Sequence, residues 1–120
     1  MITVTPQMRV LLAVEPVDFR CGIDGLARTC RKRLQADPFT GTVFVFRNKQ
    51  LTAIKCLVYD SRAFWLCHMR LSEGRLRWWP KPGTETSAPL LAQELQVLLC
   101  GGDPTGINIL PAWRPILAET

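Results

Sequence analysis

The stretch that decides the fold is FTGTVFVFRNKQLTAIKCLVYDSRAFWLCHMRLSEGRLRWWP, which runs from Phe39 to Pro80. Strand-like runs rich in β-branched and aromatic residues alternate in it with polar turns. This spacing predicts strands over 42–47, 51–59, 64–71 and 75–79, the last three forming an antiparallel meander. Because the rest of the chain offers little chemistry, we expect any activity to be binding by this sheet.

The two turns of the meander fix its expected register. A turn at 60–63 pairs Tyr59 with Phe64, and a turn at 72–74 pairs Arg70 with Arg75. Side chains alternate along a strand, so one face of the meander is predicted to be basic and the other apolar. The basic face comprises Lys55, His68, Arg70, Arg75 and Arg77, flanked by Tyr59, Phe64 and Trp79. The apolar face comprises Ile54, Cys56, Val58, Trp65, Cys67, Met69, Leu71, Leu76 and Trp78.

Two helices complete the predicted fold. An apolar stripe at helical spacing predicts a helix over 23–35, with Arg28, Arg31 and Lys32 on its polar side. A second helix is predicted to begin at an N-cap, Ser87, and to end near residue 100. With a further strand over 8–14, the sequence predicts a single α+β domain over 1–103. It has an antiparallel sheet of about five strands and two helices packed on one face. The proline-containing extension 104–120 is expected to pack on the surface.

Composition narrows the class of protein. The chain has 120 residues, of which 48% are hydrophobic and 21% charged, as in one globular domain. No apolar run approaches the ~20 residues of a membrane span, and no signal peptide is visible, which predicts a cytoplasmic protein without a membrane partner. The net charge of +5 is compatible with nucleic-acid binding. An odd set of five cysteines without a C-x-x-C pair indicates reduced thiols and no metal site.

Catalytic motifs are scarce, so the sequence predicts a non-catalytic protein without a cofactor. A phosphate-binding glycine loop is missing, and His68 is the single histidine. A nuclease using Asp18, Asp24, Asp37 and Asp60 is the enzymatic alternative, although each carboxylate lies where a turn or a helix start would use it.

The basic face instead suits DNA. Phosphates would be contacted by Lys55, Arg70, Arg75 and Arg77, while His68 and Trp79 would stack or fill a groove, and Arg28, Arg31 and Lys32 could extend the surface. The alternative for both basic surfaces is plain solvation.

Several segments resemble the small accessory protein, the second open reading frame, of bacterial insertion sequences of family 66. The matching residues are spread over nearly the whole chain, from residue 8 to 103. The motif positions are Asp18, Arg20, Gly22, Asp24, Gly25, Pro38, Phe39 and Gly41, and the match continues through Val58-Tyr59-Asp60, Phe64-Trp65-Leu66-Cys67 and Trp79-Pro80.

The resemblance implies a role in transposition beside a larger transposase. Our leading hypothesis is an accessory factor that binds DNA at the element ends and helps to assemble the transposase. The alternative is an adaptor that docks on the transposase, or on a second copy of itself, without binding DNA. Its docking segment would be a helix or the apolar tail, with Ile107, Ile109, Leu110, Trp113, Ile116 and Leu117.

Overall fold

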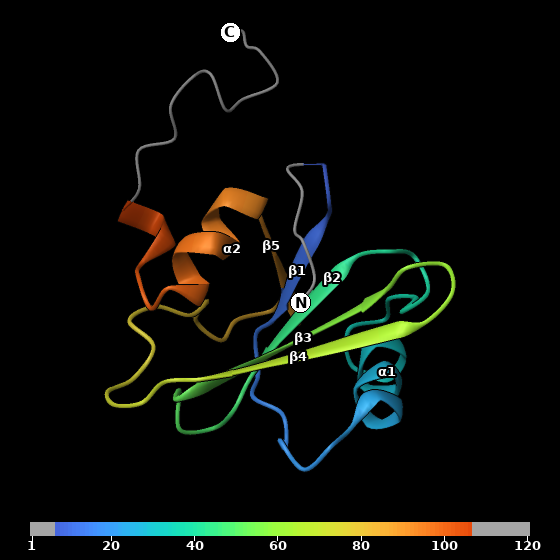
Figure 1. The fold of residues 1–120 in the computed structure, drawn as a ribbon, viewed down its shortest axis with the longest axis horizontal. Helices are drawn as coiled ribbons and strands as arrows, with labels where there is room; N and C mark the ends of the chain where they lie inside the picture. The colour runs from blue at the N-terminus through green and yellow to red at the C-terminus, as the bar shows by residue number, and fades with distance from the viewer. Residues whose placement is uncertain (1–6, 107–120) are drawn as a thin grey trace, which may run out of the picture.

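A five-stranded sheet with a helix on each face forms the body of the protein, shown in Figure 1. The computed structural model describes residues 7–106. The strands are β1 (Val10–Ala13), β2 (Val43–Arg47), β3 (Ala53–Tyr59), β4 (Phe64–Arg70) and β5 (Ser87–Leu90). The helices are α1 (Ile23–Lys32), α2 (Ala92–Leu99) and the short 3-10 helix η1 (Pro104–Gly106). The predicted α+β class is confirmed.

The strand order is β4-β3-β2-β1-β5, and the sheet is mixed rather than wholly antiparallel. β1 and β2 run parallel, with Val10 beside Val43, while the other three pairs of neighbours are antiparallel. The parallel pair arises because α1 lies between β1 and β2 in the chain and carries it back to the start of the next strand. This connection also brings the carboxyl ends of β1 and β2 to the same end of the sheet.

The first half of the predicted meander is confirmed residue by residue. In the β3–β4 hairpin Tyr59 pairs with Phe64, Lys55 with His68 and Ala53 with Arg70. The carboxylate of Asp60 closes the turn, because it accepts the backbone N–H groups of Arg62 and Ala63. A strict alternation of side chains and a well-defined turn were sufficient to fix this register.

The third strand of the meander, predicted over 75–79, is wrong. After β4 the chain leaves the sheet and returns so that the Leu76 N–H donates to the Leu51 carbonyl at 2.7 Å. The Trp79 indole N–H donates to the Ala13 carbonyl, on a distant strand, at 2.9 Å. Leu76 and Trp79 thus pack into the core individually, and these tertiary contacts override the local alternation.

The fifth strand comes instead from residues that were predicted to begin the second helix. Ser87–Leu90 pairs antiparallel with β1, and Pro89 lies opposite Leu11. Proline is accommodated because β5 is an edge strand and needs no ladder donor at that position. α2 then begins after Leu91, whose backbone N–H donates to the Glu94 carboxylate at 2.7 Å.

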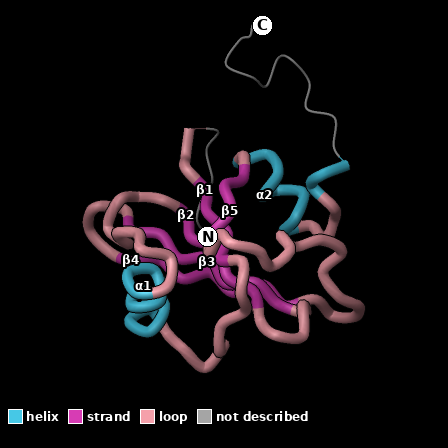
Figure 2. The backbone as a smooth tube through the Cα atoms, turned by 180° about the vertical axis from the view of Figure 1, so that it is seen from behind, coloured by secondary structure: helices cyan, strands magenta, loops and turns pink. Residues whose placement is uncertain are grey.

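The two helices cover opposite faces of the sheet, which corrects the prediction that both pack on one face (Figure 2). α2 covers the face that carries Val10, Leu12, Val43, Val45, Ile54, Cys56 and Val58. α1 covers the face that carries Leu11, Ala13, Phe44, Phe46 and Leu57. The central strands are apolar on both sides, so each face needs its own cover.

Within residues 7–106, every helix is too short or too polar to cross a bilayer. Of the predicted surface extension 104–120, Pro104–Gly106 forms η1, and the remaining residues, Trp113 among them, lie outside the described part of the chain.

Candidate nucleic-acid interface

Lys55 lies on the α1 face of the sheet, in β3, but its ammonium group is already occupied. The residue is only 7% exposed. Its Nζ donates to the carbonyls of Phe19 and Cys21, at 2.8 and 2.9 Å, and lies 5.0 Å from the centre of the Phe19 ring. Lys55 therefore holds the segment between β1 and α1 against the sheet, and its predicted contact with phosphate is corrected to this structural role.

The segment that Lys55 holds carries an ion pair on its outer side. The Arg20 guanidinium binds both oxygens of Asp18, with the shortest contact at 2.7 Å, and the Arg20 backbone N–H also donates to Asp18. These hydrogen bonds from Arg20 lower the pKa of Asp18 to about 2. The Arg20 side chain remains 90% exposed, so its outer N–H groups face solvent.

Cationic side chains converge on one end of the sheet. Val17 donates to the Arg47 carbonyl at the end of β2, which places the 16–20 segment there. The Asn48 N–H donates to the carbonyl of Ala53, and Ala53 pairs with Arg70. The 48–50 turn and Arg70 therefore lie at the same end of the sheet. The bond from Leu76 to Leu51 adds Arg75 to this end. We call the four exposed cations Arg20, Lys49, Arg70 and Arg75 the basic end.

A shallow cleft of about 630 Å³ opens between two of these segments. It is lined by Pro16, Val17, Asp18, Phe19 and Arg20 on one side and by Asn48, Lys49 and Gln50 on the other. The sequence predicted only a polar turn at 48–50. No local signal reveals that this turn faces the 16–20 segment, because the contact depends on the parallel pairing of β1 and β2.

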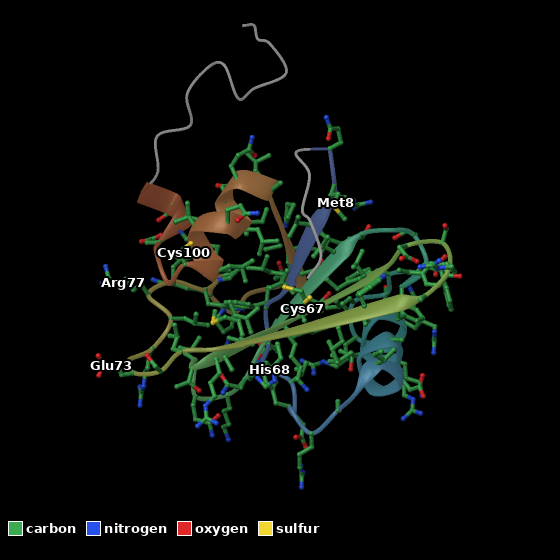
Figure 3. The ribbon with its side chains drawn as sticks, in the orientation of Figure 1. Met8, Cys67, His68, Glu73, Arg77 and Cys100 are labelled. Carbon is green, nitrogen blue, oxygen red and sulfur yellow. The ribbon has the colours of Figure 1, made fainter. Side chains whose placement is uncertain are left out.

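His68 and Arg70 are exposed on the same face of β4, as predicted. The His68 ring meets the Phe19 ring edge-on, with centroids 5.5 Å apart, so the imidazole adjoins the segment that carries Arg20. Figure 3 shows His68 on the lower side of the sheet and Arg77 on the other side, next to α2. The prediction that His68 and Arg77 share one face is therefore wrong.

The remaining predicted residues lie apart from this face. Trp79 packs in the α2-side core, where its indole N–H is already bonded, so its predicted stacking role is corrected. Arg77 is exposed on that side. On α1, the exposed side chains of Arg28, Arg31 and Lys32 form a second basic patch.

The motif positions mostly shape the backbone. Gly22 directly precedes α1, Asp24 lies in the first turn of that helix, and a Cβ on Gly25 would come within 3.0 Å of the Cys21 side chain. Pro38 is buried, and Gly41 has φ +86°, which favours glycine, just before β2.

The motif residue Phe39 is 52% exposed, and its ring lies 4.9 Å from Tyr59 and 5.1 Å from Phe64, at the end of the sheet opposite the basic end. The sequence predicted that Tyr59 and Phe64 are neighbours, but not that Phe39 joins them.

The carboxylates and thiols have local roles. Hydrogen bonds from the Trp65 indole, and from backbone N–H groups in the turn, lower the pKa of Asp60 to about 2. Asp37 accepts the backbone N–H of Phe39. Burial raises the pKa of the Cys30 and Cys56 thiols to about 12. Between residues 7 and 106, no three metal-ligating side chains of the His, Cys, Asp and Glu types lie together.

A family model and two similar proteins each match nearly the whole length of the chain. The family model described as IS66 Orf2 like protein matches residues 8–108. The protein y4jC of Sinorhizobium fredii is 34% identical over 109 residues, which are 90% of this chain and 91% of that protein. The protein y4hO of the same organism is 32% identical over 109 residues, 90% of each chain. Both are described as uncharacterized. No solved structure matches the chain.

Proposed function

The chain belongs to the IS66 Orf2-like family, and from this premise we propose that it binds DNA through the basic end of its sheet. Membership of this insertion-sequence family suggests an accessory role in transposition. In the proposed role the protein binds the ends of the element and helps the transposase to assemble there.

The observation that carries the proposal is the convergence of exposed cations from four separate segments on one end of the sheet. In the described part of the chain, no carboxylate lies within ion-pairing distance of Lys49, Arg70 or Arg75, whereas Arg20 is paired with Asp18. Unpaired cations on a rigid scaffold attract the phosphate backbone and release its counterions. His68, beside Arg70, can add a hydrogen bond to a phosphate or a base edge.

The basic patch on α1 is a second contact in this proposal. Arg28, Arg31 and Lys32 lie on the helix that covers the same face of the sheet as Lys55. Double-stranded DNA carries one negative charge per about 1.7 Å of its axis, so it can meet both patches along its length. Arg77 lies on the other side of the sheet and is left out of the proposed contact surface.

The test is fluorescence anisotropy with a labelled duplex from the element end and a scrambled duplex, titrated over a range of salt concentrations. If four phosphates are neutralised, log affinity falls against log salt with a slope of roughly −4. We expect the double variant Lys49→Ala, Arg70→Ala to make that slope less steep by about two.

The control is Arg62→Ala combined with Lys81→Ala, which removes the same charge at exposed positions outside the basic end. This control should keep a slope close to that of the wild type. Binding by the Lys49, Arg70 variant with the wild-type slope would overturn the assignment. Equal binding of the two duplexes would support the assigned binding surface but would rule out specific recognition of the element end.

A second candidate function, docking on the transposase, is favoured by the aromatic cluster of Phe39, Tyr59 and Phe64. Exposed aromatic rings are common anchors of protein interfaces. The tail that the sequence suggested for this role lies outside the described residues. Calorimetric titration of the element's transposase with the Phe39→Ala variant separates docking from DNA binding. Weakened association with the transposase and unchanged DNA binding would support docking. Unchanged association would rule docking through this cluster out.

A further inference from the structure

The two edge strands of the sheet differ in how well they are protected against pairing with a further strand. The edge strand β5 has four residues and contains Pro89, which cannot donate to another strand. The edge strand β4 has seven residues, FWLCHMR, without proline or glycine and with one charged residue, Arg70, at its end. Figure 1 shows β4 at the rim of the sheet, and among residues 7–106 no strand pairs with its outer side. A long edge strand with so little protection is a template for strand addition.

The hydrogen bonds between β3 and β4 identify the backbone groups of β4 that are free to pair with an added strand. The Leu71 N–H donates inward to Thr52, and alternate residues of an antiparallel strand point the same way. Met69, Cys67 and Trp65 therefore bond to β3, while Phe64, Leu66, His68 and Arg70 direct their N–H and C=O groups outward. No hydrogen bond to these outward groups is present in the described part of the structure.

These outward groups are self-complementary about Cys67, the middle residue of β4. With Cys67 opposite Cys67 of a second copy, Leu66 pairs with His68 of that copy and Phe64 with its Arg70. All four outward residues then exchange hydrogen bonds, and no two charges of the same sign lie opposite each other. A shift that places Leu66 opposite itself would bring Arg62 against Arg70.

The side chains fit the same register. On the α2 side, Trp65 lies opposite Met69 of the second copy, a favourable contact of sulfur with an aromatic ring. Trp65 is 44% exposed, and Cys67 and Met69 border a cavity of about 360 Å³ beside Leu99, so the face is not fully covered within one copy. On the α1 side, Phe64 lies opposite Arg70, where a cation can rest on a ring.

We propose that β4 pairs antiparallel with β4 of a second copy, centred on Cys67, to join two sheets into one of ten strands. The tail of the same chain suits this edge less well, because Pro111 and Pro115 interrupt any strand that it could add. The two-fold axis passes perpendicular to the sheet, so both α1 faces lie on the same side. This pairing does not depend on DNA binding, and because the two β4 strands run antiparallel it would place the two basic ends at opposite ends of the pair.

The experiment is oxidative cross-linking of the full-length protein with copper phenanthroline in air, which oxidises two thiols to a disulfide and passes the two electrons to oxygen. In a non-hydrogen-bonded antiparallel pair the two Cα atoms lie about 4.5 Å apart, within the range that a disulfide spans. We expect a covalent dimer linked through Cys67, identified by mass spectrometry. Cys67→Ser should abolish it, whereas Cys100→Ser, at a more exposed thiol, should retain it.

A matched pair of variants tests the backbone pairing itself. His68→Pro removes one outward N–H and should abolish both the Cys67 cross-link and the dimer in sedimentation velocity, while His68→Ala should retain both. Circular dichroism checks that His68→Pro is folded. A wild-type protein that is monomeric and forms no Cys67 cross-link would overturn the proposal, as would a dimer cross-linked through Cys100 instead. Because DNA is absent from these experiments, failure here is distinct from failure of the proposed function.

Discussion

The two faces of the sheet are built on different principles. The α2 face is apolar throughout, and Leu76, Leu95 and Leu98 pack on it with hardly any exposed surface of their own. The α1 face is apolar only beneath its helix. Beyond the helix it contains a buried lysine, a segment held by that lysine and an ion pair at the surface. The α2 face thus mainly stabilises the fold. On the α1 face, a buried polar group replaces part of the apolar core and holds a polar segment in place.

The comparison shows why a buried cation is retained in a small core. The Lys55 ammonium binds two backbone carbonyls in the segment between β1 and α1. Polar hydrogen bonds fix the position of a segment more specifically than apolar contacts do. The position of Arg20 and of one wall of the cleft therefore depends on Lys55, although Lys55 itself is too buried to meet a ligand.

The largest expected effect is on the apolar face. Leu95→Ala removes a fully buried side chain at the centre of the α2-side core. We expect the free energy of unfolding, measured by urea denaturation, to fall by about 2–5 kcal/mol. Leu91→Ala, at a 54% exposed position next to α2, should change it by less than about 0.5 kcal/mol. Equal losses for the two variants would show that α2 is not closely packed on the sheet.

A smaller effect is expected from Lys55→Met on the other face. The change leaves the carbonyls of Phe19 and Cys21 without their donor and should lower the free energy of unfolding by about 1–3 kcal/mol. Lys49→Met, at an exposed position, is the control and should have little effect on stability. A variant that is as stable as the wild type would indicate that the cost of burying the ammonium balances its two hydrogen bonds.

The smallest effect concerns the ion pair at the surface. Because the pKa of Asp18 is lowered from its usual 3.8 to about 2 in the folded protein, the pair contributes its full stability above the unfolded value. That contribution is lost as the pH falls through the folded value. We expect Asp18→Asn to lower the thermal midpoint slightly near neutral pH, and the difference from wild type to shrink as the pH falls toward and below about 2.

The acid dependence of Asp60 serves as the internal comparison. Its pKa is also about 2, but the main cause is the Trp65 indole rather than an arginine. The variant Asp18→Asn should therefore keep the acid dependence that comes from Asp60. A difference between the variant and the wild type that stays constant down to the lowest pH would argue against the ion pair with Arg20.

The sequence was most informative where structure is local. The β3–β4 register could be predicted because alternation and an Asp60 turn act over a few residues. The family motifs likewise pointed to the 18–25 segment and to Pro38–Gly41, although not to what those residues contact. The site was predicted in part: His68 and Arg70 lie on the expected face, whereas Lys55 is occupied and Trp79 lies in the core.

What the sequence alone determined was the class of fold, its first helix, the central hairpin and a basic surface, because periodicity and turn chemistry are properties of neighbouring residues. Only the tertiary structure decided that β1 and β2 run parallel, that β5 replaces the expected strand at 75–79, and that the helices lie on opposite faces. These features depend on contacts between residues far apart in the chain. Apolar strands that can be buried on both sides do not specify which helix will cover which side.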